Sequence, residues 1–108
     1  MDPLTASELR GTWATVLLPW GDDEAIDLER LDAQLAHLLA SGVAGVYTNG
    51  TAGEFLAQSE DEFLEVSRRV AAACTAAGVP FQLGATHLSP QTTLARVRAT
   101  RALAPSAY

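Results

Sequence analysis

The most informative absence in this sequence is lysine, because all 7 basic residues among its 108 residues are arginine. Covalent catalysis through a Schiff base needs a lysine amine as the nucleophile. These 108 residues therefore cannot form a Schiff base by themselves. The same absence argues against a nucleotide-binding half-domain with a phosphate-loop lysine, and no Gly-x-Gly-x-x-Gly motif is present either.

Cysteine and histidine are also scarce. Cys74 is the only cysteine, which excludes an intrachain disulfide and a cysteine-based metal site within one chain. The two histidines, His37 and His87, have no partners at metal-ligand spacing. We therefore expect a reducing, cytoplasmic setting and neither a metal nor another cofactor.

Positive charge and long apolar runs are lacking too. The chain has 13 acidic residues and a net charge of −6, which repels nucleic-acid phosphates and anionic lipids. No stretch approaches the roughly 20 apolar residues of a membrane span, and the N-terminus lacks the apolar region of a secretory signal. Nucleic acids and membranes are therefore not expected as partners.

Three short apolar runs predict buried strands, at residues 12–18 (TWATVLL), 43–48 (VAGVYT) and 81–85 (FQLGA). Residues 105–108 are expected to open a fourth strand. Each pair of runs is separated by a helical pattern. Alternation of strands and helices predicts an α/β fold with a parallel sheet and right-handed crossovers.

The three helices are predicted from their start and stop signals. Asp27 is an N-cap before leucines at three- and four-residue spacing, and Gly42 stands at the stop. Ser59 and Glu62 have the spacing of a capping box, and that helix ends at Gly78. Ser89 precedes a first-turn proline, and the third helix is expected to run to about residue 103.

The segment Gly50-Thr51-Ala52-Gly53-Glu54 follows the second strand at its carboxyl end, where active-site loops lie in parallel α/β folds. Its glycines allow a tight turn with exposed N–H groups that can hold a carboxylate or phosphate. Thr51 adds a hydroxyl that can donate and accept a proton. An ordinary strand-to-helix turn is the alternative interpretation.

The wider segment GVAGVYTNGTAGEFLAQSEDEF (residues 42–63) resembles the dihydrodipicolinate synthase and N-acetylneuraminate lyase family, whose second strand ends in Gly-Thr-Thr-Gly-Glu or Gly-Ser-Thr-Gly-Glu. Residues 11–27 and 78–86 are similar to that family's first and third units. The resemblance implies the first three β/α units of a (β/α)8 TIM barrel. Residues 1–108 would then be the N-terminal part of one barrel domain, with no internal boundary.

The resemblance also implies a class I Schiff-base lyase or synthase that acts on pyruvate or a related 2-oxo acid, commonly as a homotetramer. Thr51 would be the catalytic relay hydroxyl, and the turn from Gly50 to Ala52, through the Thr51 and Ala52 amides, would hold the substrate carboxylate. The lysine on strand six, the tyrosine on strand five and a strand-four tyrosine would all lie beyond Tyr108. The parent protein is thus expected to be an enzyme, while these residues alone are not.

Three departures from the family pattern bear on the substrate. Ala52 replaces a threonine, Leu18 replaces the threonine before Pro19, and Thr86-His87 stands where a second glycine is common. His87 is a candidate substrate contact at the end of the third strand, with an ordinary loop histidine as the alternative.

Glu54 is expected mainly to bond backbone or helix N–H groups, rather than to act as a general base. Aromatic residues near the strands are expected to pack or to form a pocket wall; these are Trp13, Trp20, Tyr47 and Phe55. His37 is expected to have a surface or packing role. A different function class also remains open, in which the turn from Gly50 to Gly53 belongs to a non-catalytic module that binds a small carboxylate or phosphate.

Overall fold

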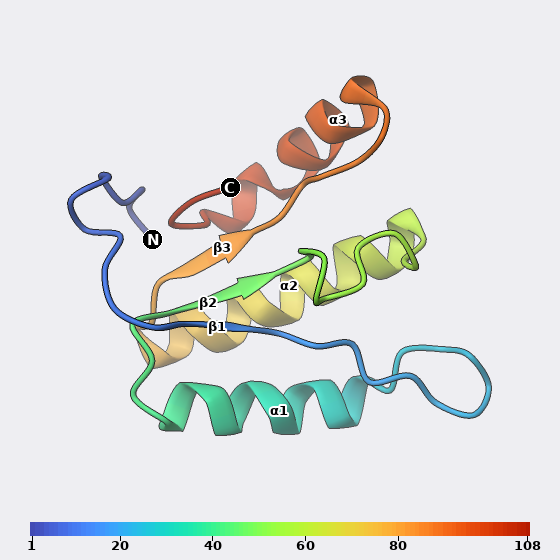
Figure 1. The fold of residues 1–108 in the computed structure, drawn as a ribbon, viewed down its shortest axis with the longest axis horizontal. Helices are drawn as coiled ribbons and strands as arrows, with labels where there is room; N and C mark the ends of the chain where they lie inside the picture. The colour runs from blue at the N-terminus through green and yellow to red at the C-terminus, as the bar shows by residue number, and fades with distance from the viewer.

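The computed structural model describes residues 1–108 and has the alternating order that the sequence predicts (Figure 1). Its elements are β1 (Trp13–Thr15), α1 (Leu28–Ala40), β2 (Gly45–Thr48), α2 (Glu60–Ala77), β3 (Phe81–Leu83), α3 (Pro90–Thr100) and the short 3-10 helix η1 (Arg101–Leu103). The strands form one parallel sheet in the order β1-β2-β3. The prediction of an α/β fold with a parallel sheet is confirmed.

The helix ends lie where the capping residues predict them. The side chains of Asp27, Ser59 and Ser89 each accept a hydrogen bond from a backbone N–H group in the first turn of their helix. Ser59 and Glu62 bond reciprocally, so the capping box is formed. Gly78 ends α2 in the left-handed region at φ 68°, which suits glycine.

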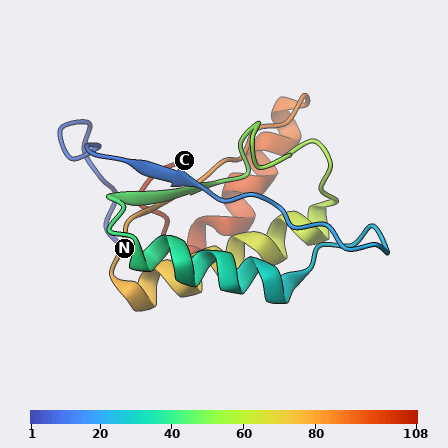
Figure 2. The same ribbon diagram turned by 60° about the horizontal axis from the view of Figure 1, so that its bottom comes forward.

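One face of the sheet is covered by α1 and α2, which lie together on the same side (Figure 2). The core between sheet and helices contains Val16, Leu18, Leu31, Leu35, Val46, Val66, Val70, Ala71, Cys74, Phe81 and Leu83. Burial raises the pKa of the Cys74 thiol to about 11, so the thiol stays protonated and serves as packing.

The opposite face of the sheet carries a different set of side chains. Thr15 pairs with Tyr47, and Tyr47 pairs with Gln82, so these three residues form a row across all three strands. Paired residues point to the same side of a sheet. All three are half-buried and lie outside the hydrophobic core. This row is therefore more polar than the core on the helix-covered face.

The predicted fourth strand begins beside β3. Ala107 forms a parallel bridge with Gln82, and Ser106 N–H donates to the Phe81 carbonyl at 2.9 Å. The N-terminal segment reaches the same place, because Leu4 N–H donates to the Ser106 carbonyl at 2.8 Å. The two ends of the chain accordingly lie close together (Figure 1). None of the helices is long and apolar enough to cross a membrane.

The first strand is shorter than the run of residues 12–18 predicts. Beyond Thr15, the Gln34 side chain takes the place of a strand partner for Leu17. Its amide oxygen accepts from Leu17 N–H at 2.8 Å, and its amide nitrogen donates to the Leu17 carbonyl at 3.0 Å. An amide side chain offers the same donor and acceptor as a peptide group, so it ends the ladder without leaving that backbone unsatisfied.

A buried arginine joins the second and third units. The Arg96 side chain is only 2% exposed and forms a forked pair with Glu60, with the shortest contact at 2.6 Å. Its guanidinium also donates to the Thr86 carbonyl at 2.7 Å and lies 4.6 Å from the centre of the Phe63 ring. These contacts offset the cost of burying the charge. No local sequence pattern predicts this role for Arg96.

We predict that replacing Arg96 with methionine lowers the free energy of unfolding by about 1–3 kcal/mol, because charge-assisted hydrogen bonds and a cation–π contact are lost. Denaturant unfolding followed by circular dichroism measures this change. Arg98→Met is the matched control, since Arg98 is exposed in the same helix and its loss should change stability by less than about 0.5 kcal/mol. Equal effects of the two substitutions would contradict the role assigned to Arg96.

A second prediction concerns pH. The hydrogen bond from Arg96 holds the pKa of Glu60 below its ordinary value of 4.5. A carboxyl group whose pKa is lower in the folded state stabilises the fold at every pH above its unfolded-state pKa. This stabilisation is lost as the pH falls through the lower, folded-state pKa. Glu60→Gln should therefore be less stable than the wild type at pH 7, and the gap should shrink below pH 4.5 in thermal unfolding. A gap that stays constant from pH 7 to pH 3 would rule out this linkage.

Candidate functional site

The predicted turn lies directly after β2, at the carboxyl end of the sheet (Figure 1). Thr51 and Ala52 are exposed, whereas Gly50 and Gly53 are buried on either side of them. The two middle residues of the turn therefore face solvent while its ends are fixed in the protein.

The turn presents backbone donors that the protein does not use. Neither the Thr51 nor the Ala52 N–H group donates a hydrogen bond within the chain. Thr51 instead contributes its carbonyl, which accepts from Glu54 N–H at 3.1 Å. Two adjacent free N–H groups can hold one carboxylate or phosphate oxygen without a cationic side chain. The Thr51 hydroxyl adds a proton donor and acceptor beside them.

Glycine is required where the ends of the three strands approach one another. A Cβ atom on Gly53 would lie 2.9 Å from the Val16 carbonyl oxygen. A Cβ atom on Gly84 would lie 2.5 Å from the Asn49 carbonyl oxygen. Both neighbours are backbone atoms, which cannot move aside as a flexible side chain can. The two glycines thus let the backbones after β2 and β3 close around the turn.

A buried network centred on Asn49 fixes the start of the turn. Asn49 has φ 58°, in the left-handed region that asparagine tolerates better than most residues. Its side-chain amide donates to Ser67 Oγ at 3.2 Å, and its oxygen accepts from Gln58 Nε2 at 3.1 Å. No local pattern in the sequence predicts this network, and the only signal for Asn49 is that asparagine tolerates the left-handed region.

The Glu54 side chain has a different partner from the one that the sequence predicts. We expected its carboxylate to bond backbone or helix N–H groups. Instead, its Oε2 accepts a hydrogen bond from Trp20 Nε1 at 2.8 Å. Glu54 has φ 51°, so its backbone is strained and the Trp20 contact helps to hold it. Trp20 in the loop after β1 is therefore the hydrogen-bond donor to Glu54, and the spacing of residues in the sequence does not predict this contact.

The two histidines lie apart from the turn's cavity. The cavity beside Thr51, of about 250 Å³, is lined by Thr51, Glu54, Phe55, Leu56 and Ala57 and does not include His87. His87 is exposed in the loop after β3, and its Nδ1 accepts from Ser89 N–H at 2.9 Å. His37 is exposed on α1. No cluster of His, Cys, Asp or Glu in the structure has a geometry that could hold a metal ion.

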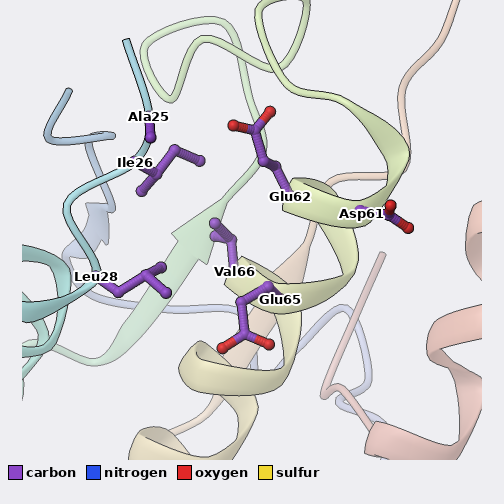
Figure 3. Close-up of a pocket in the computed structure, with 7 residues that line it drawn as sticks. All are labelled: Ala25, Ile26, Leu28, Asp61, Glu62, Glu65 and Val66. Carbon is purple, nitrogen blue, oxygen red and sulfur yellow. The ribbon is translucent and has the colours of Figure 1, made fainter. Parts of the chain in front are cut away.

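A larger groove of about 280 Å³ lies between the loop after β1 and the first turns of α2 (Figure 3). Ile26, Leu28 and Val66 point toward one another across it, while the Asp61 carboxylate points away. The other two carboxylates are engaged, Glu62 in the capping box and Glu65 with Arg69. None of the residues that line this groove belongs to the turn, and its centre is apolar, so the turn remains the candidate site.

We predict that Asn49→Ala lowers the free energy of unfolding by about 2–4 kcal/mol, because alanine is strained at this φ and two buried polar groups lose their partner. Asn49→Gly relieves the backbone strain without restoring the hydrogen bonds, so it should lose less. Chemical denaturation of both variants separates the two effects. If the alanine and glycine variants lose the same unfolding free energy, the left-handed conformation adds no strain in the alanine variant. If neither variant is less stable than the wild type, the network does not hold the turn.

Comparisons with known proteins bear on this geometry. The model of the dihydrodipicolinate synthetase family matches residues 8–100. A 4-hydroxy-tetrahydrodipicolinate synthase of Sorangium cellulosum is 37% identical over 95 residues, which cover 87% of this chain and 31% of the relative. An N-acetylneuraminate lyase of Rhizobium meliloti is 35% identical over 68 residues, which cover 63% of this chain and 23% of the relative.

Solved structures agree on the fold. The dihydrodipicolinate synthase of Bacillus clausii superposes with a TM-score of 0.86 at 20% identity, and the match covers 94% of this chain and 34% of that one. The chain thus spans about a quarter to a third of the length of the proteins that it matches. Its three parallel β/α units are the first part of a (β/α)8 barrel fold. With the family model matching most of its length, the chain belongs to the dihydrodipicolinate synthetase family.

Proposed function

We propose that this chain is the N-terminal part of a single barrel domain in a lyase or synthase that forms a Schiff base with pyruvate or a related 2-oxo acid. The observation that carries the proposal is the pair of free N–H groups at Thr51 and Ala52, beside an exposed hydroxyl, at the carboxyl end of β2. Active sites of (β/α)8 enzymes lie at this end of the strands.

In this proposal the turn binds one end of the substrate. The Thr51 and Ala52 N–H groups hold the carboxylate, with Gly50 allowing the backbone to turn beneath it. Because Ala52 has no hydroxyl, its contribution is limited to the backbone. Thr51, which is exposed, relays a proton through its hydroxyl. His87 is a proposed outer contact, since it lies outside the Thr51 cavity.

The amine that forms the Schiff base has to come from a lysine outside residues 1–108, because these contain none. The tyrosines that complete the proton relay are likewise assigned to other residues of the protein. We further propose a cytoplasmic homotetramer, in line with the resemblance and with the single buried thiol. No cofactor takes part in this scheme.

The proposal is tested by treating the purified protein with pyruvate and borohydride and then measuring its mass. We expect a stable reduced adduct that maps to a lysine outside the residues described here. Thr51→Val should still form the adduct but lose about 10²- to 10⁴-fold in kcat, because only the proton relay is removed. Thr51→Ser keeps the hydroxyl and should retain most of the activity.

The results also separate the proposed enzyme from a non-catalytic binding module. If no adduct forms, but pyruvate or phosphate shifts the amide signals of Thr51 and Ala52 in an NMR titration, the turn binds anions without chemistry. If neither ligand shifts those signals and no adduct forms, both functions are excluded. An adduct together with full activity of Thr51→Val would leave the Schiff base intact and remove Thr51 from the relay.

A further inference from the structure

Tyr47 is the third residue of β2, and the burial of its two chain neighbours places it on the opposite face of the sheet. The helices α1 and α2 leave that face uncovered (Figure 2). The neighbours of Tyr47 in the register are Thr15 on β1 and Gln82 on β3, both half-buried. Its chain neighbours Val46 and Thr48 point to the other side, and both are fully buried. The Tyr47 side chain therefore belongs to a polar row and not to the hydrophobic core.

The side chain leans along the strand toward the turn. A Cβ atom on Gly50 would lie 1.8 Å from the Tyr47 hydroxyl oxygen and 2.3 Å from Cζ. No side chain larger than that of glycine fits at residue 50 while Tyr47 keeps this position. Because Gly50 has no side chain, the Tyr47 hydroxyl can lie against the backbone that leads into Thr51.

The hydroxyl has no hydrogen-bond partner within the chain, in contrast to the other tyrosine. Tyr108 Oη lies 3.0 Å from Thr100 Oγ1 and donates to the Val97 carbonyl at 3.2 Å. Tyr47 is half-buried, and its register with Thr15 and Gln82 places its side chain on the uncovered face of the sheet. A phenol usually finds a partner when it is buried, which makes this donor available to a bound ligand.

Resting on the proposed function, we infer that Tyr47 is a substrate-contacting residue whose hydroxyl donates a hydrogen bond to the carboxylate held by the Thr51 and Ala52 N–H groups. A carboxylate has two oxygens and accepts up to about four hydrogen bonds, so two backbone donors leave it unsatisfied. The alanine side chain at residue 52 cannot add one. The Tyr47 hydroxyl is the side-chain donor that the fold places against the start of the turn.

The test compares Tyr47→Phe with the wild type in an NMR titration with pyruvate, in which the amide signals of Thr51 and Ala52 report binding. Phenylalanine keeps the ring over Gly50 and removes only the hydroxyl. We expect the Kd for pyruvate to rise about 10-fold, the effect of one hydrogen bond to a charged group. The melting temperature should not change, because the hydroxyl has no partner to lose.

Tyr108→Phe is the matched control, because it removes a hydroxyl that is bonded within the chain, to Thr100 and Val97 on α3. It should leave the Kd unchanged and lower the melting temperature. Labelling tyrosine Cζ with carbon-13 gives a second readout, in which pyruvate shifts the Tyr47 signal and leaves that of Tyr108 in place. This readout needs no substitution, so it does not depend on whether a variant folds.

The outcomes distinguish this inference from the proposal on which it rests. Pyruvate binding with the same Kd in Tyr47→Phe, or an unmoved Tyr47 Cζ signal, would overturn the role of Tyr47 and leave the turn as a carboxylate site. No pyruvate-dependent shift at Thr51 or Ala52 in the wild type would instead refute the site itself, and the inference with it.

Discussion

The geometry of the candidate site depends on the buried network around Asn49. This residue turns the chain out of β2 in a left-handed conformation, and its side chain ties the turn to Ser67 on α2 and to Gln58. Gln58 also donates to the Gly53 carbonyl at 3.4 Å, so both ends of the turn share one set of contacts. Because these buried contacts already hold both ends of the turn, its exposed middle residues lose little further conformational entropy when they keep two N–H groups unbonded.

The loop after β3 is held in a similar way, by the ion pair between Arg96 and Glu60. Arg96 is buried beneath the loop after β3 and links it, through the Thr86 carbonyl, to Glu60 at the start of α2. The carboxylate of Glu60 also lies at a helix N-terminus, where negative charge is favourable. One carboxylate therefore serves both the helix dipole and the buried guanidinium. The loops after β2 and β3 are thus both anchored on α2.

The two faces of the sheet carry different kinds of side chain. The helix-covered face is filled by aliphatic and aromatic side chains that account for the core. The uncovered face holds a row of hydrogen-bonding side chains, of which Tyr47 reaches the turn. In a (β/α)8 barrel the uncovered face of the sheet is the interior, and its carboxyl end carries the site. The placement of Tyr47 follows from this division because strand residues alternate between faces.

The sequence by itself determined the helix ends, the alternation of strands and helices, the position of the turn and the absence of lysine. Caps and apolar periodicity act over three or four residues, which is why Ser59, Glu62 and Gly78 were predictable. The tertiary structure alone decided which distant side chains meet. Ser67 lies 18 residues from Asn49, Trp20 lies 34 from Glu54, and Glu60 lies 36 from Arg96. Such contacts depend on how helices and strands pack, and no local pattern encodes them.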